Sequence, residues 1–110
     1  MLFSLPLEFT KMAIPRKEII QKKWNQFIAL EPPAIYCHPP PKHIWTKNGV
    51  IIQETKDMKM TANGTLYITN IDDNAMGDYE LKMENTFLRG KGRDNAIQRA
   101  RIITLNVYGE

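Results

Sequence analysis

The clearest alternation of apolar and other side chains lies in the stretch GTLYITNIDDNAMGDYEL, residues 64–81. Leu66, Ile68 and Ile71 form its apolar side. Alternation over about four to eight residues predicts a strand with one buried face. The dipeptide Asn63-Gly64 stands at its start and is typical of a turn. We therefore expect Leu66 and Ile68 to contribute to a buried core.

A second alternating run follows the polar corner at residues 72–74. Tyr79, Leu81 and Met83 share one side of it, and the residues between them are charged. A tyrosine at such a corner can bury its ring while its hydroxyl bonds to the backbone a few residues upstream. This pattern predicts a strand with Tyr79 and Leu81 in the core.

Strand-like segments recur along most of the chain, and turn signals separate them. Asn48-Gly49 is a strong hairpin signal. The proline-rich stretch at 32–41 is expected to be extended or turning, because proline cannot donate to a strand ladder. The other expected strands are residues 25–31, 44–47, 50–52, 58–61 and 100–107. The chain therefore belongs to the all-β class.

Residues 1–24 fit two descriptions. Met12–Pro15 and Glu18–Ile20 suit the two halves of an interrupted first edge strand, with Pro15 at the interruption. The residues from Ile14 to Phe27 also give a partial helical period after a proline. We treat 1–24 as a lead-in with the first edge strand and 25–110 as the body of a single domain, and the helix stays open as the alternative.

These segments together resemble an immunoglobulin domain. The run L-x-I-x-x-I followed by G-x-Y is similar to strands E and F of that family, with Tyr79 in its tyrosine-corner place. Trp45, after the proline run, stands where the family has its core tryptophan, and ARIITLNV at 100–107 resembles the closing strand. The resemblance spans residues 25–107 and is closest to the intermediate set. It implies a two-sheet antiparallel sandwich with Greek-key topology and a core of Trp45, Tyr79, Leu81, Leu66 and Ile68.

The chain has one cysteine, so it cannot form an internal disulfide. In the family a disulfide usually joins two facing strands, and the resemblance implies Leu81 at one end and Pro32 or Pro33 at the other. Cys37 stands too close to Trp45 for that spacing, and we interpret it as a loop residue. A core without this bridge lacks a contribution of about 2–4 kcal/mol, which packing must replace.

Length and charge narrow the possible functions. A chain of 110 residues forms one domain. Its 43% hydrophobic and 25% charged content is ordinary for a folded globular domain. The net charge of +3 does not indicate nucleic-acid binding. No apolar run approaches the ~20 residues that span a bilayer, so we expect no membrane insertion by this chain.

The sequence holds no convincing catalytic or metal site. Cys37, His38 and His43 are metal-ligand types, but a structural zinc site needs four ligands in pairs of set spacing. We expect them to be solvent-exposed loop residues without a metal. None of the common catalytic motifs is present, so we expect no enzyme activity and no cofactor.

Two features suggest a surface contact. Arg89, Lys91 and Arg93 form a basic segment that, with the flanking Arg99 and Arg101, is predicted to be a hairpin tip. It is either a solvated loop or a contact surface for an acidic partner or a sulfated glycan. Asn63-Gly64-Thr65 is an N-glycosylation sequon on a predicted surface turn, relevant if the chain enters the secretory path.

The resemblance implies non-catalytic protein–protein recognition or spacing, with homotypic contact as one form. One setting is the ectodomain of a receptor or adhesion molecule, since NGTLYI is similar to neural adhesion molecules of the contactin and L1 type. The other is an intracellular muscle or cytoskeletal protein of the titin type, which the lone cysteine favours. We favour the first, which makes the expected protein an extracellular glycoprotein.

Overall fold

The fold is described from a computed structural model, in residues 15–33, 41–84 and 97–109. These residues form eight strands and one short 3-10 helix. Within them, no helix is long and apolar enough to cross a membrane. The elements are β1 (Lys17–Lys23), β2 (Ile28–Leu30), β3 (Lys42–Lys47), β4 (Val50–Ile51), β5 (Met58–Met60), β6 (Leu66–Ile68), η1 (Asp73–Ala75), β7 (Gly77–Glu84) and β8 (Ile97–Tyr108).

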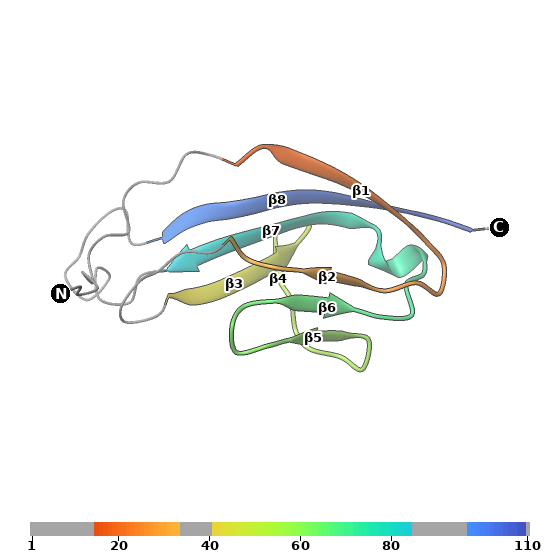
Figure 1. The fold of residues 1–110 in the computed structure, drawn as a ribbon, viewed down its shortest axis with the longest axis horizontal. Helices are drawn as coiled ribbons and strands as arrows, with labels where there is room; N and C mark the ends of the chain where they lie inside the picture. The colour runs from red at the N-terminus through yellow and green to blue at the C-terminus, as the bar shows by residue number, and fades with distance from the viewer. Residues whose placement is uncertain (1–14, 34–40, 85–96, 110) are drawn as a thin grey trace.

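The strands form two sheets that face each other (Figure 1). The larger sheet has the order β1-β8-β7-β3-β4, and the smaller has the order β2-β6-β5. All neighbouring strands pair antiparallel except β1 and β8, which pair parallel. The predicted all-β sandwich is confirmed.

For residues 17–23, the structure decides between the strand and the helix that the sequence left open. Lys17–Lys23 is a strand and not a helix, and it pairs with β8 from Lys17 opposite Ile102 to Lys23 opposite Tyr108. Met12–Ile14, the first half of the expected strand, lies outside the described residues. Because β1 belongs to the larger sheet, a division after residue 24 does not separate it from the sandwich.

The turn between β3 and β4 follows the sequence signal. Asn48 and Gly49 have φ angles of 51° and 85°. Two consecutive positive φ angles are what a tight two-residue hairpin needs, and asparagine and glycine adopt them most easily. The Asn48 N–H donates to the Asp78 carbonyl (2.7 Å), and Asn48 Oδ1 accepts from the Asp78 N–H (2.9 Å). These bonds fix the turn against the start of β7.

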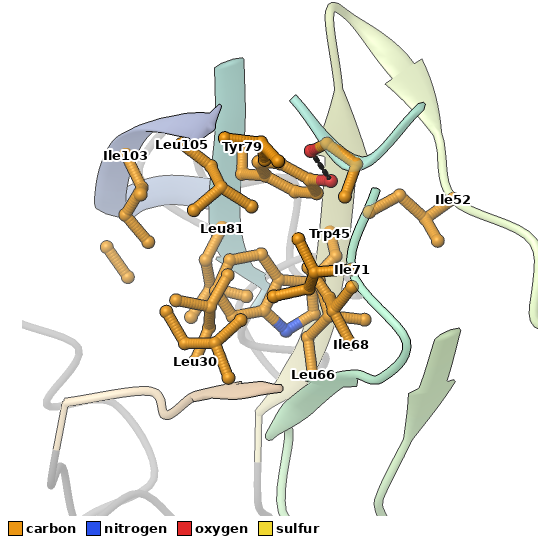
Figure 2. Packing of buried hydrophobic residues seen from close by; sticks show 14 of the residues in the cluster. Leu30, Trp45, Ile52, Leu66, Ile68, Ile71, Tyr79, Leu81, Ile103 and Leu105 are labelled. Carbon is orange, nitrogen blue, oxygen red and sulfur yellow. Dashed lines mark hydrogen bonds between the residues drawn. The ribbon is translucent and has the colours of Figure 1, made fainter. Parts of the chain in front are cut away.

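The core lies between the two sheets and centres on an indole (Figure 2). Trp45, Tyr79, Leu81, Leu66 and Ile68 are all at most 1% exposed. Leucine and isoleucine side chains from both sheets surround them, namely Ile28, Leu30, Ile71, Ile103 and Leu105. The structure buries the residues that strand alternation places inside, and it buries Trp45, which the family resemblance places there.

Several strand boundaries differ from the expected ones. β2 is only Ile28–Leu30, shorter than the expected 25–31, and β8 begins at Ile97 instead of residue 100. The early part of β8 pairs with the end of β7, where Glu84 stands opposite Ile97. A register shift after Leu81 leaves Ala100 without a partner on β7. The polar residues at the start of β8 gave no strand signal in the sequence. They form a strand because β7 lies beside them, since a strand's length depends on its neighbour as well as on its own pattern.

Candidate recognition surface

Trp45 connects the core to the turn that follows β5. Its side chain is 1% exposed, and its Nε1–H donates to the Gly64 carbonyl at 2.8 Å. A buried indole N–H needs such a partner, since leaving it unpaired is costly. The β5–β6 turn, which carries Asn63, is therefore held against β3.

Gly64 is required at this turn for two separate reasons. Its φ of +93° lies in the left-handed region that favours glycine. A Cβ at this position would also stand 2.7 Å from His43 Nε2 and closer still to the ring carbons Cγ and Cδ2. The His43 ring thus packs directly beneath the turn. Burial lowers the pKa of His43, because desolvation disfavours the charged imidazolium.

Tyr79 forms the tyrosine corner that the sequence predicts, with its ring buried and its hydroxyl bonded to the backbone upstream. Its hydroxyl donates to the Ala75 carbonyl at 2.6 Å, the dashed bond in Figure 2. Ala75 ends η1, and Asp72 caps this helix by accepting from the Asn74 N–H. Burial raises the pKa of Tyr79 to about 12, because its phenolate would lose hydration. The bond and the cap together fix the connection between β6 and β7.

Leu30 on β2 and Leu81 on β7 are buried leucines of the two sheets, and the resemblance implies Leu81 as one end of the family's disulfide. They are 1% and 0% exposed, and they lie beside the Trp45 indole (Figure 2). The expectation of Pro32 or Pro33 at the other end, on the strand that faces β7, is wrong, because both prolines lie beyond β2 and are only half-buried. The connection from β2 to Trp45 is longer than the family spacing assumes, so counting back from Trp45 passes the end of the strand.

A groove opens between the two sheets where β3 faces β5. It has a volume of about 180 Å³. Its walls are mostly apolar, and Lys42 and His43 are its polar side chains. We call this site the β3–β5 groove, and it is lined by Lys42, His43, Ile44, Trp45, Ile51, Ile52 and Met60.

Residues 32–95, more than half of the chain, match the family model of the immunoglobulin I-set domain. The chain belongs to the immunoglobulin I-set family. Solved structures agree on the fold of this I-set domain. The Sidekick-1 immunoglobulin domains 1–4 match with a TM-score of 0.69 and 18% identity, over 86% of this chain and 24% of that one. The predicted relation to the intermediate set is confirmed.

Two further similar structures are extracellular domains of a Drosophila protein and a domain of titin. The extracellular domains 3–5 of Drosophila OTK match with a TM-score of 0.62 and 19% identity, over 89% of this chain and 31% of that one. The titin M3 domain matches with a TM-score of 0.60 and 13% identity, over 86% of this chain and 91% of that one. The I-set domain spans about a quarter of the Sidekick-1 structure, and no curated protein matches it. At these identities the likeness shows the fold alone.

The sequon of this I-set domain lies on the turn held by Trp45. Asn63 is exposed, and its amide oxygen accepts from the Thr61 hydroxyl. Thr65 is only 4% exposed, and its N–H donates to the Thr61 hydroxyl oxygen. The Asn63 side chain is thus at the surface of the folded domain, as expected of a modified asparagine.

Of the five basic residues expected at the hairpin tip, the structure describes only Arg99 and Arg101. Arg89, Lys91 and Arg93 lie outside the described residues. The expectation that Arg99 and Arg101 extend this hairpin tip is wrong, because both belong to β8. Arg99 forms an ion pair with Glu80. Arg101 binds Glu18 through two nitrogens, at 2.5 and 2.9 Å, and donates to the Glu31 carbonyl at 2.9 Å. Each arginine thus pairs with a carboxylate on a neighbouring strand of the larger sheet.

The candidate metal ligands do not form a group in the described part of the chain. His43 packs under Gly64, while Cys37 and His38 lie outside the described residues. In the described residues no cluster of three or more His, Cys, Asp or Glu side chains could hold a metal ion. The acidic residues of the corner have other roles: Asp72 caps η1, and Asp78 accepts from the Thr104 hydroxyl.

The β3–β5 groove was not predicted from the sequence. Its lining residues come from β3, β5 and the segment around β4, so no single stretch of sequence contains them. A weak signal was present, because the polar run at 53–57 follows the short strand after Asn48-Gly49. Such a run indicates that the chain leaves the sheet early and exposes the strand it was covering.

Proposed function

We propose that this I-set domain is a non-catalytic recognition or spacer module of a cell-surface receptor or adhesion molecule. The observation that carries the proposal is the sequon Asn63-Gly64-Thr65 on an exposed turn. The Trp45–Gly64 hydrogen bond holds this turn against the core. A glycan on Asn63 would therefore extend into solvent while the sandwich beneath it stays packed.

Expression in a secretory host tests this proposal. We expect the secreted domain to lose mass on enzymatic deglycosylation, and we expect the Asn63→Gln variant to show no such loss. Asn106→Gln is a matched control, because Asn106 is an exposed asparagine of β8 outside any sequon. A secreted domain without a glycan on Asn63 would overturn the extracellular assignment.

The alternative is an intracellular module of a muscle or cytoskeletal protein, similar to titin domains. A core that packs Leu30 and Leu81 without an internal disulfide favours it, because such a core folds equally well in a reducing compartment. The expected result is a domain that folds in the cytosol and whose unfolding midpoint is unchanged by reductant. A secreted protein that carries a glycan on Asn63 would contradict this alternative.

We also propose that Arg89, Lys91 and Arg93 contact an acidic protein or a sulfated glycan. The proposal rests on their charge and spacing, and on the separate engagement of Arg99 and Arg101. Replacing the three with alanine should lower the salt concentration that elutes the domain from heparin. The matched control replaces Lys17, Lys22 and Lys59, which removes the same charge elsewhere. Equal elution of both triple variants would refute a local contact.

A further inference from the structure

Among the residues that the structure describes, none pairs with the first half of β3 on its β4 side, and we call this unpaired position the vacant place. β3 pairs with β7 along its whole length, from Lys42 opposite Glu84 to Lys47 opposite Tyr79. On its other side β4 covers only Thr46 and Lys47. The last hydrogen bond on that side runs from the Ile52 N–H to the Trp45 carbonyl, at 3.0 Å. Beyond it the chain leaves for β5, and no described residue pairs with this side of β3.

The backbone of His43 faces this vacant place. In an antiparallel ladder the N–H and C=O groups of successive residues point to opposite sides of the strand. The Trp45 carbonyl points toward the β4 side, and so do the N–H and C=O of His43, two residues earlier. Among the described residues, none bonds to these two groups on that side. They present one donor and one acceptor for an added strand.

The outer edge of β5, by contrast, is covered by side chains. On the outer side of β5, the Met60 N–H donates to Glu54 Oε2 at 2.7 Å, and the Met58 N–H donates to Thr55 Oγ1 at 3.2 Å. Side chains that cover strand edges prevent unwanted strand pairing. The β3 edge lacks such a cover in the described part of the chain.

The β3–β5 groove lies at this vacant place and can hold a side chain. An apolar cavity of about 150 Å³ is large enough for benzene, and the groove has about 180 Å³. A residue placed opposite His43 on an added strand would point its side chain to the same face as the His43 ring. That face is the interior, where Trp45, Ile52 and Met60 line the groove.

The charge of the groove indicates the kind of partner. Lys42 is the charged residue among its lining residues, and no carboxylate lines it. In the described structure Lys42 has no ion pair, not even with Glu84, its cross-strand neighbour. A second copy of the chain would bring a net charge of +3 and the same lysine, which disfavours self-pairing here. A segment with carboxylates next to its apolar residue fits better.

We propose that an extended segment of a partner protein adds to β3 beside His43, with a large apolar side chain in the β3–β5 groove and a carboxylate near Lys42. Backbone hydrogen bonds supply affinity in such strand addition, and the side-chain pocket supplies specificity. This inference rests on the recognition function proposed above and names the site and the chemistry of the partner.

The test uses the short peptide EVTFTVE, whose phenylalanine and two valines share one face. Titration into the isotope-labelled domain should shift the backbone amide signals of His43, Ile52 and Met60. Methylating the backbone nitrogen of the phenylalanine removes the donor that faces His43 and should weaken binding about tenfold. Methylating a threonine nitrogen, which faces solvent in this register, should leave the affinity unchanged.

Charge variants provide the second test. Lys42→Glu should weaken binding of EVTFTVE about fivefold and strengthen binding of the lysine-flanked peptide KVTFTVK. Lys59→Glu is the matched control, because it makes the same charge change on β5 at an exposed position outside the groove. Lys42→Glu places a second carboxylate opposite Glu84 and should lower the thermal midpoint, so binding is measured at a temperature well below the midpoint of every variant.

Several results would overturn the proposal. They are no amide shift at millimolar peptide, equal effects of the Lys42 and Lys59 variants, or equal binding of both methylated peptides. Dimerisation of the unliganded domain through the same amides would assign the edge to a second copy. None of these results changes whether Asn63 carries a glycan, so the two proposals fail separately.

Discussion

The replacement Gly64→Ala separates two costs that usually occur together at a glycine. Gly64 and Gly49 have similar φ angles, +93° and +85°. An alanine at either position is held in the left-handed region at a cost of about 1–2 kcal/mol. A Cβ at Gly49 has nothing within 4 Å, whereas a Cβ at Gly64 collides with the His43 ring. Gly49→Ala therefore measures the backbone cost alone.

The expected difference follows from what must move at Gly64. Displacing the half-buried His43 ring resembles overpacking, which typically costs about 1–3 kcal/mol. A shift of the turn also weakens the Trp45–Gly64 hydrogen bond, whose net contribution is about 1 kcal/mol. Gly49→Ala gains about 0.4–1 kcal/mol by restricting the unfolded chain, and so does Gly64→Ala. We expect Gly49→Ala to cost about 1 kcal/mol and Gly64→Ala about 3 kcal/mol.

Urea unfolding followed by circular dichroism measures both values, and a double-mutant cycle identifies the cause. In the His43→Ala background the collision is absent, so Gly64→Ala should cost no more than Gly49→Ala. Neighbouring residues that share a contact show such coupling, of about 0.5–3 kcal/mol. Equal costs for the two glycine variants, or an unchanged cost of Gly64→Ala in the His43→Ala background, would refute the reasoning.

Three further predictions concern the core and its titration. Leu81→Ala should lower the free energy of unfolding by about 2–5 kcal/mol, because it leaves a cavity beside Trp45, while Cys37→Ser should be nearly silent in the same urea assay. Tyr79 has a folded-state pKa of about 12 against an ordinary value of 10.0, so its contribution is complete below pH 10 and is lost as pH rises toward 12. Tyr79→Phe should remove this alkaline loss. The pKa of His43 lies below its ordinary 6.5, so the unfolded chain takes up the proton first and stability falls as pH drops below 6.5. His43→Gln should flatten that acid limb, and an unchanged limb would contradict the burial of the ring.

Much of the sandwich could be predicted because its signals are local. The alternation around Leu66 and Tyr79 depends only on which side chains prefer water, and the Asn48-Gly49 turn depends only on the φ angles that these residues adopt. Boundaries were less certain. The polar start of β8 becomes a strand because β7 lies beside it, and β1 becomes a strand because β8 offers it a partner.

The candidate sites show the same division. The sequence identified Asn63 as a possible modification site, and the structure places it on an exposed turn. The sequence could not assign Arg99 and Arg101 correctly, because their acidic partners Glu80 and Glu18 lie far along the chain. Counting back from Trp45 did not lead to the buried Leu30, because the connection between β2 and β3 can vary in length. The burial of Leu30 depends instead on which face of β2 it occupies.

The sequence alone determined that this chain is an immunoglobulin-type sandwich with an indole at its centre and no covalent bridge. It did so because the preference for burial, the alternation of side chains and the preference for turns depend only on each residue and its near neighbours in the sequence. Only the tertiary structure decided that β3 keeps one open edge over an apolar groove. That edge exists because the chain leaves β4 early and returns at β5, so the groove is formed by residues that meet only when the two sheets pack.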